Sequence, residues 1–177
     1  MDRYWLLTWT TYGSWLPGDR RGFVSNVPSK SGPSVRHNSP DTPPDADIPW
    51  MRTHALGLLE SEIVRLTREQ AESVCDQFEE TAKFRGWELL AGAVMANHIH
   101  LVVGVQGDPE PDSLLKDFKS YASRRLNRLF GRRERWWTEG GSKRKLPDET
   151  AVHAAVEYVK NQEFPLVTRL HHGAQGE

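Results

Sequence analysis

Two histidines, His98 and His100, stand out in the apolar stretch "WELLAGAVMANHIHLVVGV" as side chains that could do chemistry. Residues two apart on a β-strand share one face, so both imidazoles would project from the same side of a sheet. Imidazoles in such neighbouring positions can bind one metal ion. The alternative is two polar residues at the exposed start of a strand. A His-x-His spacing alone does not separate these interpretations, and a metal site needs a further ligand.

A tyrosine and a glutamine in "AVHAAVEYVKNQ" are candidates for a nucleophile and a third ligand. Tyr158 and Gln162 are four residues apart, which places them on one face of a helix. Val152, Val156 and Val159 form the expected buried stripe, and the tyrosine falls at its edge. Tyr158 could merely border the core. If the helix lies across the histidine face, a phenol would stand beside a metal site completed by the Gln162 amide.

The charge of the chain is divided between a basic arm and an acidic arm. The net charge of the 177 residues is −1, but residues 116–145 hold eleven Lys or Arg and three Asp or Glu, a net of +8. Aromatic residues interrupt this arm, and cations interleaved with rings suit single-stranded nucleic acid. The alternative is a solvated helix face. The candidate DNA-binding residues are Lys116, Lys119, Arg124, Arg125, Arg128, Arg132 and Arg133.

The elements that must position these groups follow from hydrophobic periodicity and from turn and capping residues. Thr67 followed by Gln70 has capping-box spacing, and Gly86 ends that helix. In chain order, we expect a strand at 3–13, a helix at 67–86, strands at about 87–95 and 98–105, a helix from Asp112 or Ser113 to Gly131, a strand or hairpin within 135–146, and a helix at about 148–163. This order predicts an α+β, ferredoxin-like βαββαβ antiparallel sheet, with two helices on one face and an appended C-terminal helix carrying Tyr158.

The length and composition predict a single domain over residues 1–165 and a flexible tail at 166–177. A Pro-rich and polar insertion is expected at about 14–53, where seven of the eleven prolines lie. The single cysteine excludes a disulfide framework and a cysteine zinc cluster, which fits a reducing cytoplasm. No apolar stretch approaches the roughly 20 residues that span a bilayer, so no membrane partner is expected.

These motifs together resemble a known family. "MANHIHLVV" resembles the His-hydrophobe-His signature of the HUH single-strand DNA endonucleases, and "EYVKNQ" resembles the catalytic helix of their single-tyrosine members, the REP-associated tyrosine transposases. The resemblance covers residues 3–12 and 67–164. Two departures are Ala96, where a proline is common, and the long insertion at 14–66.

The resemblance implies a metal-dependent single-stranded DNA endonuclease and strand transferase that works through a 5′-phosphotyrosine. Tyr158 would be the nucleophile, and His98, His100 and Gln162 would hold Mg²⁺ or Mn²⁺. The implied partners are single-stranded or hairpin DNA and a second copy of the chain, in the cytoplasm at the nucleoid. Two other classes stay open from the residues: a non-catalytic binder of structured single-stranded nucleic acid, and a metal phosphoesterase that uses water.

Overall fold

The computed structural model describes residues 2–16, 26–29, 32–36, 49–107 and 109–171. The chain forms two compact units. The first comprises Met1–Tyr12 and Val64–Glu177, and the second is Gly13–Ile63. The second unit, which contains the expected insertion, holds two paired strands and a helix: β2 (Asn26–Ser29), β3 (Gly32–Arg36) and α1 (Pro49–Gly57). Other parts of that insertion lie outside the described residues.

A five-stranded antiparallel sheet forms the centre of the first unit. Its order is β6-β1-β5-β4-β7. The strands β6, β1, β5 and β4 have the arrangement of a ferredoxin-like fold, which confirms the predicted fold class. The strands are β1 (Asp2–Thr10), β4 (Glu88–Val94), β5 (His98–Gln106), β6 (Ser142–Leu146) and β7 (Val167–Leu170).

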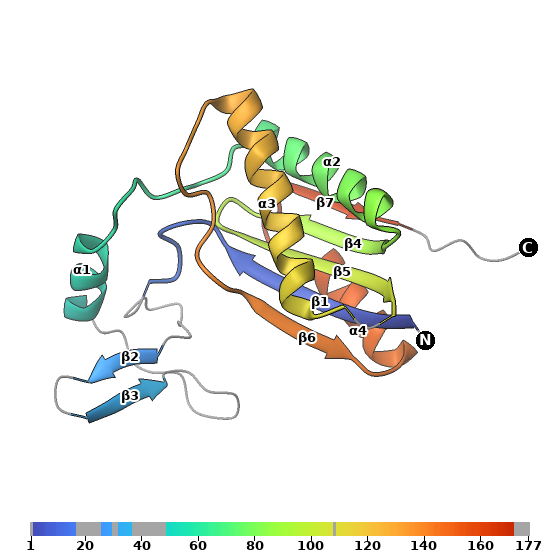
Figure 1. Ribbon diagram of the computed structural model, residues 1–177, viewed down its shortest axis with the longest axis horizontal. Helices are drawn as coiled ribbons and strands as arrows, with labels where there is room; N and C mark the ends of the chain where they lie inside the picture. The colour runs from blue at the N-terminus through green and yellow to red at the C-terminus, as the bar shows by residue number, and fades with distance from the viewer. Residues whose placement is uncertain (1, 17–25, 30–31, 37–48, 108, 172–177) are drawn as a thin grey trace, which may run out of the picture. The chain divides into compact units, whose positions relative to one another are not determined.

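Helices cover both faces of this sheet (Figure 1). The helices α2 (Arg68–Arg85) and α3 (Pro111–Phe130) pack on one face, and α4 (Glu149–Lys160) packs on the other. On the first face, Phe78 of α2 makes edge-to-face ring contacts with Trp9 of β1 and Phe118 of α3. On the second, apolar residues of α4 pack against those of β1, β4, β5 and β6. The sheet therefore has a two-helix face and an α4 face.

The capping signals of α2 are confirmed atom by atom. The Thr67 hydroxyl accepts a hydrogen bond from the Gln70 backbone N–H, and the Gln70 side chain accepts one from the Thr67 N–H. Gly86 ends the helix in the left-handed conformation that glycine adopts at least cost. The start of α3 differs from expectation, because Glu110 occupies the cap position and its side chain makes no capping hydrogen bond.

The C-terminal region differs from the sequence prediction in two ways. The expected flexible tail at 166–177 is wrong over its first residues, because Val167–Leu170 forms an edge strand paired with β4. The Leu166 N–H donates to the Val94 carbonyl and begins this pairing. The remainder, 172–177, lies outside the described residues. In addition, α4 ends at Lys160, before the predicted end near Glu163. No helix in the described part of the chain is long and apolar enough to cross a membrane.

Candidate active site

The two histidines lie side by side on the α4 face of the sheet. Strand β5 begins at His98, and its alternation sends Ile99 and Leu101 to the two-helix face. The imidazole centroids of His98 and His100 are 5.0 Å apart, and the ring planes stand at 85° to each other. The expected shared face is therefore present.

Each imidazole also contacts a polar side chain through its Nδ1 atom. Nδ1 of His98 lies 2.7 Å from the carboxamide oxygen Oδ1 of Asn97. An amide oxygen can only accept, so Nδ1 donates the hydrogen in this contact, and Nε2 is the ring nitrogen left to face a metal ion. Nδ1 of His100 lies 2.7 Å from the Thr8 hydroxyl, which can either donate or accept. These contacts are of the kind that orients metal-binding histidines.

Asn97 and Thr8 are not among the residues predicted from the sequence to form the site. Asn97 stands next to His98 in the chain, so its position was a usable signal. Thr8 is 92 residues away from His100, and only the β1–β5 register, which pairs them directly, brings them together. No feature of the sequence alone specifies that register.

His100 is uncharged at neutral pH because it is buried. Its exposed fraction is 4%. Burial, with a smaller contribution from His98, lowers the pKa of His100 to about 4. A neutral imidazole keeps a nitrogen lone pair, which is the form that binds metal ions.

Tyr158 projects from α4 toward the histidine pair. Its ring centroid lies 5.2 Å from that of His100, in an edge-to-face arrangement. Its neighbour Val159 is fully buried, whereas Tyr158 is 50% exposed. The buried stripe thus fixes the helix on the sheet and leaves the phenol beside the histidines and open to solvent. An exposed phenol in this position is accessible to a large substrate.

Gln162 follows α4, in a different local structure from the predicted one. The helix ends before it, so the two residues do not share a continuous helical face. The Gln162 side-chain N–H donates instead to the backbone carbonyl of Tyr158, at 3.0 Å. This bond uses the amide nitrogen and leaves the oxygen Oε1 as the atom that could bind a cation.

The donor set fits a divalent transition ion. Two imidazoles and one amide oxygen are ligands that such ions accept. Among the described residues, no cluster of three or more His, Cys, Asp and Glu side chains could hold a metal. A metal at the histidine pair therefore needs a ligand of another type, and the candidate is Gln162, whose side chain is hydrogen-bonded to the Tyr158 carbonyl.

Lys119 and Arg125, which are among the seven candidate DNA-binding residues, make polar contacts within the protein. The Lys119 ammonium donates to the carbonyls of Thr138 and Gly140, and burial lowers the pKa of Lys119 to about 8. Arg125 donates to Glu80 and Asp76 of α2 and to the Ser73 hydroxyl, and its side chain is only 15% exposed. These contacts join α3 to its neighbours, and the assignment of both residues to DNA stays a prediction. Among the seven candidate DNA-binding residues, Arg133 is half-buried, and Lys116, Arg124, Arg128 and Arg132 are exposed.

Arg125→Gln is expected to lower the free energy of unfolding by about 1 kcal/mol, because it removes the ion pairs and hydrogen bonds between α2 and α3. Arg128→Gln, which removes an exposed charge from the same helix, should change it by less than about 0.5 kcal/mol. Urea titration of both variants measures the difference. Equal stabilities would show that Arg125 does not tie the helices together.

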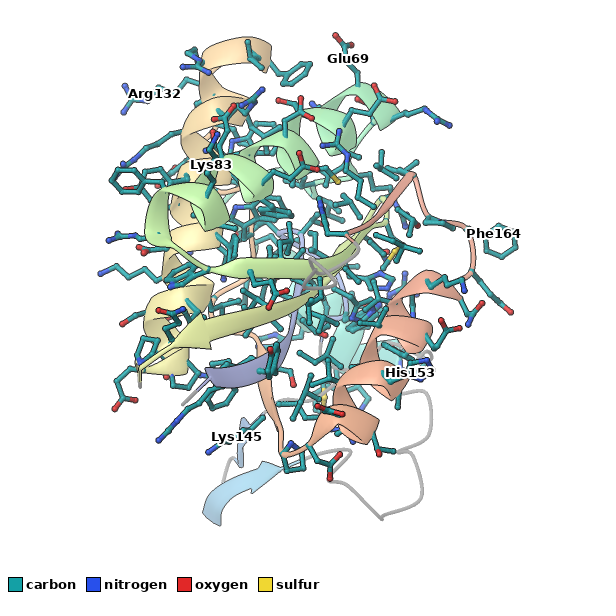
Figure 2. The ribbon with its side chains drawn as sticks, turned by 90° about the vertical axis from the view of Figure 1, so that its right-hand side faces the viewer. Glu69, Lys83, Arg132, Lys145, His153 and Phe164 are labelled. Atoms are coloured by element: carbon teal, nitrogen blue, oxygen red, sulfur yellow. The ribbon has the colours of Figure 1, made fainter. Side chains whose placement is uncertain are left out.

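The helix α3, which carries most of the candidate DNA-binding residues, lies on the sheet face opposite to the histidines. Figure 2 shows Arg132, just beyond α3, and His153, on α4, on opposite sides of the sheet. Two aromatic rings on this side are paired with guanidinium groups: Arg124 lies 5.2 Å from the Tyr121 ring centroid, and Arg133 lies 5.5 Å from that of Trp136. The thickness of the sheet therefore separates the basic residues of α3 from the histidine site.

Comparisons with known proteins place these features in a family. The model of the IS200-like transposases matches residues 51–162, which is more than half of the chain. The structure is similar to that of a REP-associated tyrosine transposase bound to a REP hairpin, with 12% identity and a TM-score of 0.51 over 89% of this chain. The present chain spans 64% of that protein. At this identity the likeness concerns the fold alone.

A second solved structure is similar over a larger share of its own length. It is the crystal structure of a candidate transposase from Deinococcus radiodurans R1, with 16% identity, a TM-score of 0.48 and 93% of each chain covered. No curated protein sequence matches the chain significantly. On the match over residues 51–162, the chain belongs to the IS200-like transposase family, whose members are DNA-processing enzymes.

Proposed function

We propose that this protein is a metal-dependent endonuclease and strand transferase that cuts single-stranded DNA through a covalent 5′-phosphotyrosine. Its substrate would be DNA next to a hairpin, because a solved structure of similar fold is a transposase bound to a REP hairpin. We further propose that it works as a homodimer on nucleoid DNA. The observation that carries the proposal is the 5.2 Å separation of the Tyr158 and His100 rings.

The chemistry begins at the phenol of Tyr158. Its oxygen forms a bond to the scissile phosphorus as the bond from phosphorus to the 3′-oxygen breaks. The phenol loses its proton and the 3′-oxygen gains one, so the products are a 5′-phosphotyrosine and a free 3′-hydroxyl. The covalent bond conserves the phosphodiester, and a second 3′-hydroxyl can reverse the step and join strands.

The roles of the other side chains follow from their contacts. His98, His100 and Gln162 would hold Mg²⁺ or Mn²⁺, which acts as a Lewis acid on the phosphate oxygens when bound. Asn97 and Thr8 orient the imidazoles through their Nδ1 atoms. The packing of α4 on the sheet holds the phenol next to the imidazoles before DNA arrives, which reduces the entropic cost of the reaction.

The proposal is tested with single-stranded oligonucleotides that contain the hairpins flanking the gene. Incubation with Mn²⁺ and separation on a denaturing gel should yield a cleaved strand and a protein band shifted by covalent DNA. A shift of a native gel without any covalent band would favour the non-catalytic binder. Cleavage without a covalent band would favour a phosphoesterase that uses water.

The exposed arginines of α3 are proposed to bind the hairpin backbone. Arg124→Gln combined with Arg128→Gln should weaken hairpin binding and flatten the dependence of log K on log salt by about 0.7–0.9 per lost phosphate contact. Fluorescence anisotropy at five salt concentrations measures both quantities. Lys83→Gln, which removes an exposed charge from α2, is the control and should leave the slope unchanged. An unchanged slope in the double variant would remove α3 from the DNA site.

A further inference from the structure

The edge strand β6 carries a cation on the same face as the histidines. In its pairing with β1, Ser142 lies opposite Thr8 and Arg144 lies opposite Leu6. Thr8 in turn lies opposite His100 in the pairing of β1 with β5. Directly paired residues share a face of the sheet, so the side chains of Ser142, Thr8 and His100 form one cross-strand row, and Arg144 begins the next row.

Among the Lys and Arg residues of the described five-stranded sheet, only Arg144 lies on the face that carries the histidines. Arg3, Lys143, Lys145 and Arg169 are opposite residues of the two-helix face, namely Val105, Leu7, Trp5 and Gly92. Arg144 is exposed and, within the described part of the chain, makes no hydrogen bond or ion pair. Another cation, Lys160 of α4, is paired with Glu157 at 3.2 Å. A guanidinium on the histidine face is thus available to a ligand.

The surface between Arg144 and the histidine pair is polar. Hydroxyl groups line it: Ser142 is exposed, and Thr8 and Thr10 are half-buried. Thr10 lies opposite His98, and its hydroxyl donates to that of Thr138. Arginine, serine and threonine are the side chains that commonly contact DNA phosphates and sugars. A strand entering over β6 would meet these groups before it reaches the imidazoles.

The distance between Arg144 and His100 suits a contact of Arg144 with a neighbouring phosphate and not with the scissile phosphate. Two strand spacings and one two-residue step separate the Cα atoms of Arg144 and His100 by about 12 Å. An arginine side chain spans only part of that distance. Its guanidinium would therefore bind a phosphate further along the same strand, on the β6 side of the histidines.

The β6 edge is also joined to α3. Lys143 of β6 forms an ion pair with Asp112 in the first turn of α3, and Lys119 of α3 bonds to the segment that precedes β6. DNA bound on the two-helix face can thus reach the histidine face by passing around β6. Arg144 stands on that route, which joins two regions that the sheet otherwise separates.

We propose that Arg144 binds a backbone phosphate of the DNA strand adjacent to the scissile phosphate, and so positions the strand for attack by Tyr158. The proposal rests on the function proposed above. The simpler account is that Arg144 protects an exposed sheet edge from pairing with another chain, as charged residues on edge strands commonly do. That account makes Arg144 and Lys145 equivalent, because both are exposed charges on β6.

Lys145 is therefore the matched control, since it is the next residue and lies on the opposite face (Figure 2). Arg144→Gln should slow single-turnover cleavage at saturating DNA about tenfold, and Lys145→Gln should change it by less than about twofold. Arg144→Lys should restore part of the rate, because a single ammonium replaces the two-pronged guanidinium contact. Equal losses in Arg144→Gln and Lys145→Gln would overturn the proposal.

A second measurement does not depend on cleavage. In the Tyr158→Phe background, oligonucleotides that carry one neutral methylphosphonate at successive positions are tested for binding by anisotropy. One position on one side of the cleavage point should weaken binding several-fold with Arg144 present and have no effect in Arg144→Gln. Identical profiles for the two proteins would exclude the contact. A position-specific difference without covalent cleavage by the wild type would support Arg144 as a DNA contact and reject the proposed chemistry.

Discussion

Tyr158→Phe is expected to abolish strand cleavage and the covalent protein–DNA adduct, with a loss of at least about 10³-fold in rate. The phenol oxygen is the proposed nucleophile, and nucleophile removal eliminates covalent catalysis altogether. The ring itself can still lie against His100, where the two centroids are 5.2 Å apart. Hairpin affinity should therefore stay within a few-fold of the wild type. Denaturing gels measure the adduct, and anisotropy measures the affinity.

Tyr121→Phe provides the matched control for this variant. Tyr121 lies on α3, on the other face of the sheet, and its ring is already paired with Arg124. It should retain the adduct at close to the wild-type rate. An adduct that persists in Tyr158→Phe and disappears in Tyr121→Phe would move the reaction to the two-helix face and refute the proposed site.

Replacement of both His98 and His100 with Ala is expected to remove Mn²⁺-dependent cleavage to a similar extent. The variant loses both imidazole ligands, and the Gln162 amide alone is a weak ligand for a divalent ion. Excess EDTA should have the same effect on the wild-type protein. Calorimetric titration with Mn²⁺ gives a reading that does not depend on DNA.

The supporting residues provide a graded comparison for the histidine pair. Thr8→Val keeps the shape of the side chain and removes the hydroxyl that contacts Nδ1 of His100. Loss of such a contact costs about 10- to 100-fold in metal affinity, which is less than the loss of a ligand. Cleavage by the wild type that continues undiminished in EDTA would contradict the metal mechanism.

Local features of the fold were predictable because their causes are local. Thr67 and Gln70 cap α2 through bonds that span three residues, and the shared face of His98 and His100 follows from the two-residue period of a strand. The order of the elements was sufficient to predict the ferredoxin-like sheet. None of these conclusions depends on the register at which two strands pair.

Features that depend on tertiary pairing were not predictable. Thr8 and Arg144 acquire their positions from the alignment of β1 with β5 and β6. The sequence does not distinguish Arg125 from the other basic residues of α3. Its ion pairs with Glu80 and Asp76 form only because α2 packs beside α3. The strand β7 is only four residues long, and its pairing with β4 is what makes it a strand. In each case a residue's role depends on a neighbour distant in sequence.

The most direct test of the central claim is to identify the amino acid that carries the DNA. The trapped adduct is digested with trypsin and nuclease, and the nucleotide-bearing peptide is sequenced by tandem mass spectrometry. The account predicts that the nucleotide is attached to the phenol oxygen of Tyr158, through a 5′-phosphate. Attachment to Tyr12, Tyr121 or any other residue, or attachment through a 3′-phosphate, would contradict it.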